Sequence, residues 1–320
     1  MIQKDLYQKD IAREIDGVIK ANDDRHLRTE LEEYVMTDEL LGNSSGNRML
    51  PGLFAELAIP EFNKSHLLKM LSLVLSDTVL SDGTRAAKTF SEKGAADFEL
   101  ENDILRAAAI PTETILFNIQ AKSDGIQSSN TRLDPVLAVF LKVFNEHQGY
   151  DPLSPEVANI ERFLAQNGKL DYLKEQFPIR FDKSWEEARE AFFMHQYYFE
   201  QLFAEIQGVS EEQAANYVNN AINNYNLDIN AFADLVVAYL RERPKGSRVV
   251  FCVDEVGQYI AEDVTRMLSL QTIAELVSSK TEGRAFLIVT SQNDLDATVG
   301  TLNATQRHDF SRIQGRFALK

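Results

Sequence analysis

Two adjacent carboxylates, Asp254 and Glu255, directly follow a run of apolar residues at positions 249–253. An unbroken apolar run of this length is typical of a strand that is buried on both faces of a parallel sheet. Open α/β sheets bind their ligands at the carboxyl ends of the strands, where these two acids would lie. In phosphoryl transfer, a first acid helps to hold Mg²⁺ and a second can orient or activate the attacking water. The alternative interpretation is a core strand that ends in a solvated acidic turn.

Two further apolar runs predict strands that would lie beside this one. Residues 284–292 form a run that ends in the polar side chains of Thr290, Ser291 and Gln292, and residues 114–119 form a third run. We expect one of these three polar side chains to lie beside the two acids, where it would sense a γ-phosphate and help to position water. Three buried strands separated by helical stretches predict a parallel sheet.

A candidate phosphate loop occupies residues 58–65 and precedes a predicted helix at residues 66–75. In a Walker A loop, glycines let the backbone N–H groups wrap the phosphates, a lysine contacts the phosphates, and a serine or threonine contacts Mg²⁺. Lys64 and Ser65 match the last two of these requirements. We expect Asn63 and His66, which flank them, to line the same nucleotide site. The alternative for His66 is a residue that caps or lines the first turn of the helix.

The same loop departs from the Walker A pattern at four positions. Ala58 and Asn63 stand where the two glycines are expected, Pro60 removes a backbone donor, and Glu61 adds a negative charge next to an anion site. Asn63 is the least damaging departure, because asparagine adopts left-handed backbone more readily than other non-glycine residues. These substitutions weaken phosphate binding on physical grounds.

Several segments of the chain together resemble one protein family, the P-loop ATPases of the BREX phage-defence system (the BrxC/PglY family). The segments are residues 251–260, 270–276, 289–292 and 309–317, and the likeness also covers residues 115–119 and, more weakly, residues 4–6 and 15–21. The block at residues 253–260, taken together with residues 290–292, is the specific part. Members of this family are usually much longer, so the resemblance implies that the chain is the N-terminal ATPase portion of a larger protein.

The resemblance implies an α/β fold, namely an AAA-type P-loop NTPase with a parallel sheet flanked by helices and a large helical insertion. ATP would be the ligand. The expected nucleotide contacts come from Asn63, Lys64, Ser65, His66 and Asp254, with Mg²⁺ held by Ser65 and Asp254. The expected catalytic residues are Glu255, which would activate water, Ser291 and Gln292, which would sense the γ-phosphate, and Arg312 or Arg316, which would act as an arginine finger in a neighbouring subunit.

The charge balance limits the partners of the chain. Its 320 residues contain 49 acidic and 33 basic side chains, a formal net charge of −16. Because each contact with a phosphate backbone needs a local cation, direct contact with DNA is disfavoured. The expected partners are other copies of the chain in a homo-oligomer and other BREX proteins, including the methyltransferase and accessory components.

Cysteine content and hydropathy favour a cytoplasmic location. The single cysteine, Cys252, lies inside an apolar run and has no partner for an internal disulfide. No apolar stretch reaches the ~20 residues that span a bilayer, and the first residues lack the apolar region of a signal peptide. The scattered histidines do not have the spacing of a metal site.

The chain is expected to have four regions. Residues 1–45 would form an N-terminal helical extension, residues 46–120 the first part of the NTPase core, residues 121–247 a mainly helical insertion, and residues 248–320 the second part of the core. Within the insertion, helical spacing appears at residues 136–144, 154–165, 185–207 and 231–241. Aromatic residues at 192–199 are interpreted as core, with an aromatic binding stripe as the alternative.

The sequence leaves two main functions open. The leading hypothesis is an ATP-driven switch or motor, favoured by the two acids Asp254 and Glu255. The alternative is a non-hydrolysing scaffold that binds other defence proteins through its helical insertion, favoured by the altered phosphate loop. A DNA-binding module is disfavoured by the net charge.

Overall fold

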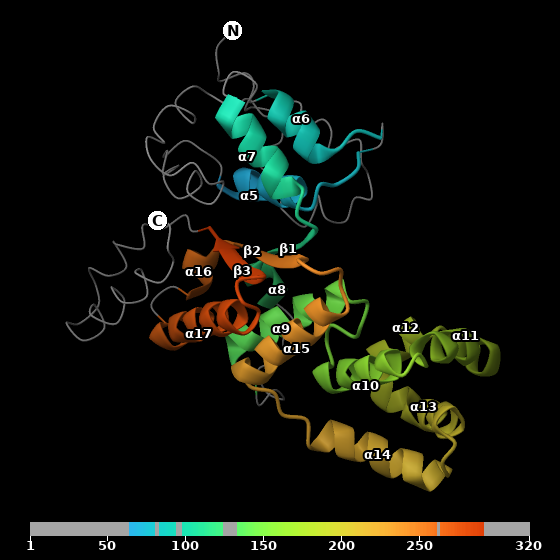
Figure 1. Cartoon of the computed structure of the whole chain (residues 1–320). Coiled ribbons are helices and arrows are strands. Elements are labelled where there is room, and N and C mark those ends of the chain that lie inside the picture. Colours follow the sequence, from blue (N-terminus) through green and yellow to red (C-terminus); the bar gives the residue numbers. More distant parts are fainter. Residues whose placement is uncertain (1–63, 81–82, 94–97, 124–132, 261–262, 291–320) are drawn as a thin grey trace. The chain divides into compact units, whose positions relative to one another are not determined.

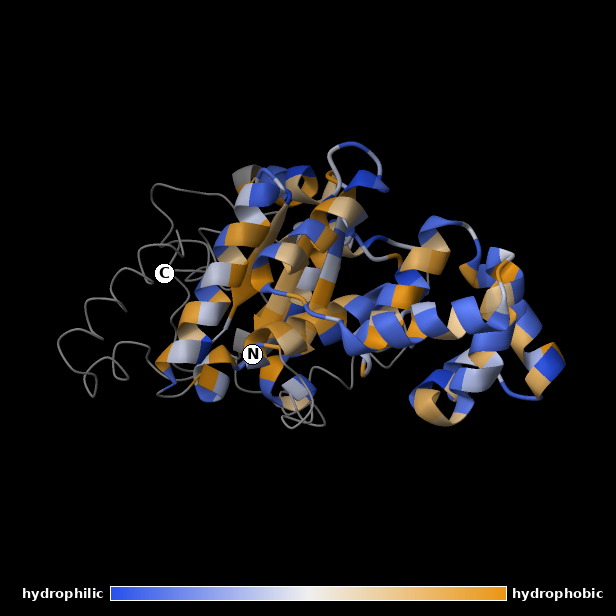
Figure 2. Ribbon diagram, turned by 90° about the horizontal axis from the view of Figure 1, so that it is seen from below, coloured by the Kyte–Doolittle hydropathy of each residue, from blue (hydrophilic) through white to orange (hydrophobic). Residues whose placement is uncertain are grey.

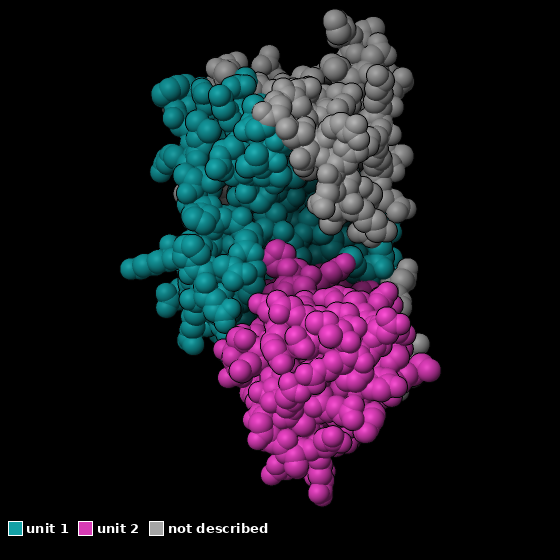
Figure 3. Space-filling model, turned by 90° about the vertical axis from the view of Figure 1, so that its right-hand side faces the viewer, with its two compact units in different colours: residues 1–124, 229–320 teal, residues 125–228 magenta. Residues whose placement is uncertain are grey.

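The computed structural model describes residues 64–80, 83–93, 98–123, 133–260 and 263–290 of the chain. These residues form an α/β structure that is mostly helical and contains a small parallel sheet flanked by helices. The chain divides into two compact units, coloured separately in Figure 3. Unit 1 comprises residues 1–124 and 229–320 and contains the sheet, and unit 2 comprises residues 125–228. The sequence analysis placed the helical insertion at residues 121–247.

Three strands form the sheet of unit 1: β1 (Thr112–Asn118), β2 (Arg248–Asp254) and β3 (Ala285–Val289). Their order is β1-β2-β3, and both pairings are parallel. β2 is therefore the middle strand, and its residues from Val249 to Asp254 are all buried. The predicted parallel sheet is confirmed. Its first strand begins at residue 112 and ends at residue 118, whereas residues 114–119 were expected.

Helices cover both faces of this sheet (Figure 1). The described helices of unit 1 are α5 (Lys64–Leu75), α6 (Ala86–Lys93), α7 (Phe98–Ala108), α8 (Ile119–Ser123), α15 (Ile229–Arg241), α16 (Val256–Ile260) and α17 (Val264–Lys280). In Figure 1, α5, α6 and α7 lie on one side of the sheet, and α15 and α17 lie on the other. The longest described helix has 17 residues, and none of the helices described is long and apolar enough to cross a bilayer.

The face toward α5, α6 and α7 is held by a single hydrophobic cluster. Val250 and Cys252 point to this face, because alternate side chains of a strand point the same way, and both are fully buried in the cluster. Figure 2 shows the hydrophobic residues gathered along the strands. The Thr114 hydroxyl also donates a hydrogen bond of 3.2 Å to the Ser72 carbonyl, which ties α5 to β1.

The opposite face of the sheet packs against α15 and α17. Phe232 of α15 contacts Phe251 of β2, with ring centroids 6.2 Å apart, and both side chains are fully buried. At one end of this layer the Lys280 ammonium on α17 lies 2.6 Å from the Asp234 carboxylate on α15. α15 therefore belongs to the sheet unit, although the sequence analysis counted its residues with the insertion.

All the regular secondary structure in the described residues of unit 2 is helical. Its helices are α9 (Pro135–His147), α10 (Pro155–Gln166), α11 (Leu170–Phe181), α12 (Trp185–Glu190), α13 (Phe192–Gln207) and α14 (Glu211–Asn223). The core centres on Trp185, the chain's one tryptophan. Its ring lies 5.4 Å from that of Phe177, 6.2 Å from that of Phe192 and 5.0 Å from that of Phe199, measured between centroids.

The stretch at residues 185–207 was expected to be continuously helical, and it is interrupted at Ala191. The backbone of Ala191 has φ −124° and ψ 50°, which ends α12 and precedes α13. This break turns the chain, so that Trp185 before it and Phe192 and Phe199 after it reach the same core. Tertiary packing of these rings outweighs the local preference for an unbroken helix.

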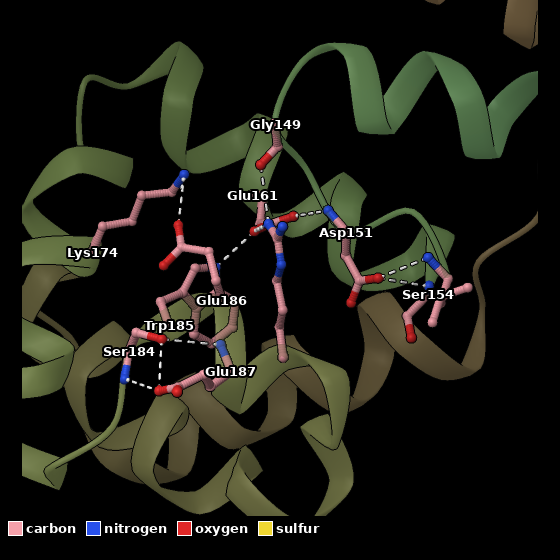
Figure 4. A network of polar contacts seen from close by, with 11 residues as sticks. Gly149, Asp151, Ser154, Glu161, Lys174, Ser184, Trp185, Glu186 and Glu187 are labelled. Carbon is pink, nitrogen blue, oxygen red and sulfur yellow. Dashed lines mark hydrogen bonds and ion pairs between the residues drawn. The ribbon is translucent and has the colours of Figure 1, made fainter. Parts of the chain in front are cut away.

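A buried carboxylate, Glu161 of α10, joins three segments of unit 2 (Figure 4). Its side chain is 1% exposed. It accepts hydrogen bonds from the Asp151 backbone N–H at 2.5 Å, the Trp185 indole at 2.7 Å and the Arg189 guanidinium at 2.7 Å. The pKa of Glu161 is raised on balance, because burial raises it more than the positive charge of Arg189 and the indole hydrogen bond lower it. The network therefore holds a charge that costs free energy to bury and needs each of its donors.

Replacing Arg189 with alanine tests the importance of this network. We expect the free energy of unfolding at pH 7 to fall by about 3 kcal/mol, because a buried carboxylate loses its cation. Arg189 stabilises the ionised form of Glu161, so this contribution is present above the pKa of Glu161 and is lost as the pH falls through it. Urea unfolding at pH 7 and pH 4.5, followed by Trp185 fluorescence, measures both effects.

The matched control is Lys174→Ala, which removes an ion pair of 3.1 Å with the half-exposed Glu186. We expect it to cost less than about 1 kcal/mol, because exposed pairs are screened by water. Equal losses in the two variants, or a loss in Arg189→Ala that does not change with pH, would contradict the assigned role of the network.

The thiol of Cys252 provides a second test, this time of the sheet. The side chain is fully buried, and burial raises the pKa of Cys252 to about 12. We expect Ellman's reagent at pH 8 to label the native chain at least about 1,000-fold more slowly than the urea-unfolded chain, since the thiolate is the reactive form. Labelling of the native chain at nearly the unfolded rate would mean that β2 is readily exposed.

Candidate functional site

Polar side chains meet at the carboxyl edge of the sheet. Asn118 ends β1, Asp254 ends β2, and Thr290 directly follows β3. Because both pairings are parallel, the three strand ends lie at one edge, and Asn118 pairs in register with Asp254. Together with Glu255, which follows Asp254, these residues are called the carboxyl-edge cluster.

Asp254 is held in place by the segment after β3. Its side chain is buried, with the residue 3% exposed, and its Oδ1 accepts a hydrogen bond from the Thr290 hydroxyl. The backbone fixes Thr290 for this contact. The Thr290 N–H donates to the Val253 carbonyl at 2.9 Å, and the Thr290 carbonyl accepts from the Val256 N–H at 3.0 Å. Thr290 therefore lies beside Asp254, and it is one of the three residues that the sequence offered for this place.

Glu255 has a backbone conformation that is unusual for its residue type. Its φ is +58°, in the left-handed region that non-glycine residues seldom adopt. Such a residue costs on the order of 1–3 kcal/mol and persists only where the surrounding structure imposes it. Here the turn links the end of β2 to α16, and it leaves the Glu255 side chain half-buried at the carboxyl edge.

The side-chain amide of Asn118 orients Glu255. Asn118 Nδ2 donates a hydrogen bond of 2.6 Å to Glu255 Oε2. The other end of the amide, Oδ1, accepts a hydrogen bond of 3.0 Å from the backbone N–H of Ala121 in α8. Because a backbone N–H can only donate, this second bond fixes which end of the amide faces Glu255. One carboxylate oxygen of Glu255 is thereby held by a defined donor.

The cluster has the chemistry of a site for a hard cation and a bound water. Carboxylate and hydroxyl oxygens suit Mg²⁺, which is usually held by one or two carboxylates together with substrate phosphates and water. Among the residues that the structure describes, no group of three or more His, Cys, Asp or Glu side chains could hold a metal by itself. The carboxylate of Asp254 is an oxygen donor of the kind that Mg²⁺ takes, and the carboxylate of Glu255 beside it can accept a proton.

The remaining predicted site residues fall into two groups. Lys64, Ser65 and His66 lie in the first turn of α5, which begins at Lys64, two residues before the predicted start at residue 66, and Ser65 is half-buried there. The others lie outside the described residues, and they are Asn63, Ser291, Gln292, Arg312 and Arg316. Of the predicted residues, the structure brings Thr290 into contact with Asp254, next to Glu255 in the chain.

Sequence reasoning recognised the strand that contains Asn118 but missed the residue as part of the site. The signal that could have found it is a polar side chain directly after the apolar positions 115–117, in the same arrangement as Asp254 after residues 249–253. Parallel neighbours that end at the same edge place such residues side by side. The same reasoning offered Thr290 as one of three candidates, with Ser291 and Gln292.

Comparison with known proteins adds no assignment to this geometry. No protein-family model matches the chain, and no solved structure matches it. The carboxyl-edge cluster is therefore the observation from which a function is inferred.

Proposed function

We propose that unit 1 is an AAA-type P-loop NTPase module that binds ATP with Mg²⁺ and hydrolyses it. The observation that carries this proposal is the carboxyl-edge cluster, in which the left-handed backbone of Glu255 and the Asn118 amide hold a carboxylate next to the buried Asp254. Strained backbone of this kind concentrates at functional sites. The parallel sheet with helices on both faces supports the proposal, because ligands of such sheets bind at this edge.

Each residue of the cluster has a distinct role in the proposed reaction. Asp254, oriented by Thr290, would help to hold Mg²⁺, with Ser65 as the second protein ligand. Glu255 would take a proton from the attacking water, and Asn118 would fix the rotamer of Glu255 for that transfer. Mg²⁺ would neutralise charge on the phosphates, and Lys64 at the start of α5 would add a positive charge there. Catalysis of this type consists mainly of positioning and electrostatic stabilisation.

The wider role in this proposal comes from the resemblance to the BREX ATPases. On that basis the chain would act in the cytoplasm as a nucleotide-driven switch or motor of a phage-defence complex, as a homo-oligomer with other BREX proteins as partners. Ser291 or Gln292 would sense the γ-phosphate, and Arg312 or Arg316 would reach a neighbouring subunit. The segments that support this role are residues 251–260 and 289–292.

A scaffold without hydrolysis is the second candidate, and one specific observation favours it. Ala58, Pro60, Glu61 and Asn63 occupy a loop that would normally wrap phosphates with glycine backbone. In this case the sheet would be kept as a framework, and the chain would act by binding other proteins.

The Glu255→Gln variant tests the proposed base. We expect the rate of ATP hydrolysis, kcat, to fall at least about 100-fold, because glutamine cannot accept the proton of the attacking water. The Kd for Mg–ATP should stay within about threefold of the unmodified chain, since the variant changes a step after binding. Titration calorimetry with Mg–ATP and a phosphate-release assay on the same samples give the two quantities.

The calorimetry also separates the two candidate functions. Binding by the unmodified chain supports the NTPase. Binding that appears only after the loop glycines are introduced, with Ala58→Gly and Asn63→Gly together, would establish the scaffold instead. Full turnover by Glu255→Gln would exclude the assigned role of Glu255.

Asn118→Asp tests the positioning of Glu255. Aspartate has almost the shape of asparagine, but its carboxylate cannot donate the bond of 2.6 Å and places a second negative charge there. We expect kcat to fall about tenfold or more, with little change in KM for ATP, because a misplaced base affects the transition state more than binding. Asn118→Ala, which adds no charge, should show the same direction of change. A lower affinity for ATP with an unchanged kcat would show that Asn118 acts in binding.

A further inference from the structure

One face of α13 in unit 2 exposes large apolar side chains. Phe193 is 74% exposed, Met194 80%, Tyr197 61% and Tyr198 43%. The sequence analysis interpreted the aromatic residues at 192–199 as core, and this interpretation is correct for Phe192 and Phe199 and wrong for Phe193, Tyr197 and Tyr198. At 3.6 residues per turn these four positions fall within one side of the helix. They are called the α13 face.

The α13 face continues into a shallow depression of the same unit. The depression is lined by Arg180, Phe181, Gln201, Ala204, Glu205, Val209 and Glu211. Two contacts join the two features. Gln201 Nε2 donates a hydrogen bond of 3.0 Å to the Tyr197 hydroxyl, and the Phe181 ring lies 4.8 Å from the Tyr198 ring. From Phe193 to Glu205 the combined surface follows about 18 Å of helix, at 1.5 Å per residue.

The unit that carries this surface is acidic. Residues 125–228 contain 16 acidic and 8 basic side chains, so this third of the chain carries half of the net charge of −16. Arg180, the cation in the depression, is already engaged by Glu205 through bonds of 2.6 and 2.9 Å. Glu211 of the depression and the neighbouring Glu212 are exposed at the start of α14. A partner that covers the apolar strip would therefore meet a negative rim.

We propose that the α13 face and its depression bind an amphipathic helix of a partner protein, with one apolar side and basic residues on the other. The apolar side would cover Phe193, Met194 and Tyr197, and lysine or arginine side chains would reach the acidic rim. Exposed aromatic and methionine side chains are the anchors that such interfaces use. A surface about 18 Å long matches a helix of about 12 residues. Strand addition would need a sheet edge, which the described residues of unit 2 do not have.

The partner helix can be represented by a designed probe. A labelled 16-residue peptide of leucine and lysine, with leucine at helical spacing and lysine elsewhere, has the required chemistry. Fluorescence anisotropy with the full chain measures its binding. We expect a Kd in the micromolar range, typical of small interfaces, and binding at least tenfold weaker for the same peptide with glutamate in place of lysine.

Two surface variants distinguish the α13 face from general attraction to an acidic protein. The double variant Phe193→Ser, Tyr197→Ser should bind the lysine peptide at least tenfold more weakly. The control Leu153→Ser removes another exposed apolar side chain of unit 2, which is 60% exposed and lies outside α13, and should change Kd less than twofold. Unchanged Trp185 fluorescence would show that both variants keep the core of unit 2.

Three outcomes would overturn the proposal. The first is equal binding of the lysine and glutamate peptides, and the second is an equal effect of the double variant and of Leu153→Ser on peptide binding. The third is a concentration-dependent dimer of the unmodified chain that the double variant abolishes, because such a dimer would assign the α13 face to a second copy of the chain. The proposal does not depend on nucleotide binding. The Glu255→Gln variant should therefore bind the lysine peptide as the unmodified chain does, whatever its ATPase activity.

Discussion

The pairing of β2 with a parallel strand on each side is the constraint on which the carboxyl-edge cluster depends. Asn118 and Glu255 are 137 residues apart in the chain and meet only because the register of β1 and β2 places Asn118 opposite Asp254. Thr290 reaches Asp254 for the same reason from the other side. Burial of β2 between two helical layers supplies the free energy that holds this register, since a shift by one residue would turn Val250 and Cys252 to the wrong face.

The two units are stabilised in different ways. Unit 1 relies on apolar contact, with Val250 and Cys252 in one cluster and Phe251 against Phe232 on the other face. Unit 2 combines an aromatic core with the buried carboxylate of Glu161, whose hydrogen bonds join three segments. Apolar contacts tolerate small displacements, whereas a buried charge requires its donors at defined positions. The network thus specifies how α10 and α12 meet, at some cost in stability.

The sequence predicted the features that depend on local pattern. Continuous apolar runs identified the strands and their parallel arrangement, and the polar residues after them located the carboxyl edge. The contact between Asn118 and Glu255 and the left-handed backbone of Glu255 could not be predicted, because they depend on strand register and on the turn into α16. Helical spacing of the aromatics at residues 192–199 likewise could not say which rings face the core, because the break at Ala191 sets the direction of α13.

The position of unit 2 within the chain has a consequence for folding. Residues 125–228 separate β1 from β2, so the first pairing of the sheet requires two segments that are far apart in the sequence. Pairings of this kind form slowly, since the intervening loop must close first. The entropic cost of closing this loop rises only with the logarithm of its length. If unit 2 has already folded, it holds the two ends of the loop closer together than an unfolded segment of the same length would. During synthesis β1 emerges long before β2, so unit 2 has time to fold while β1 still awaits its neighbour.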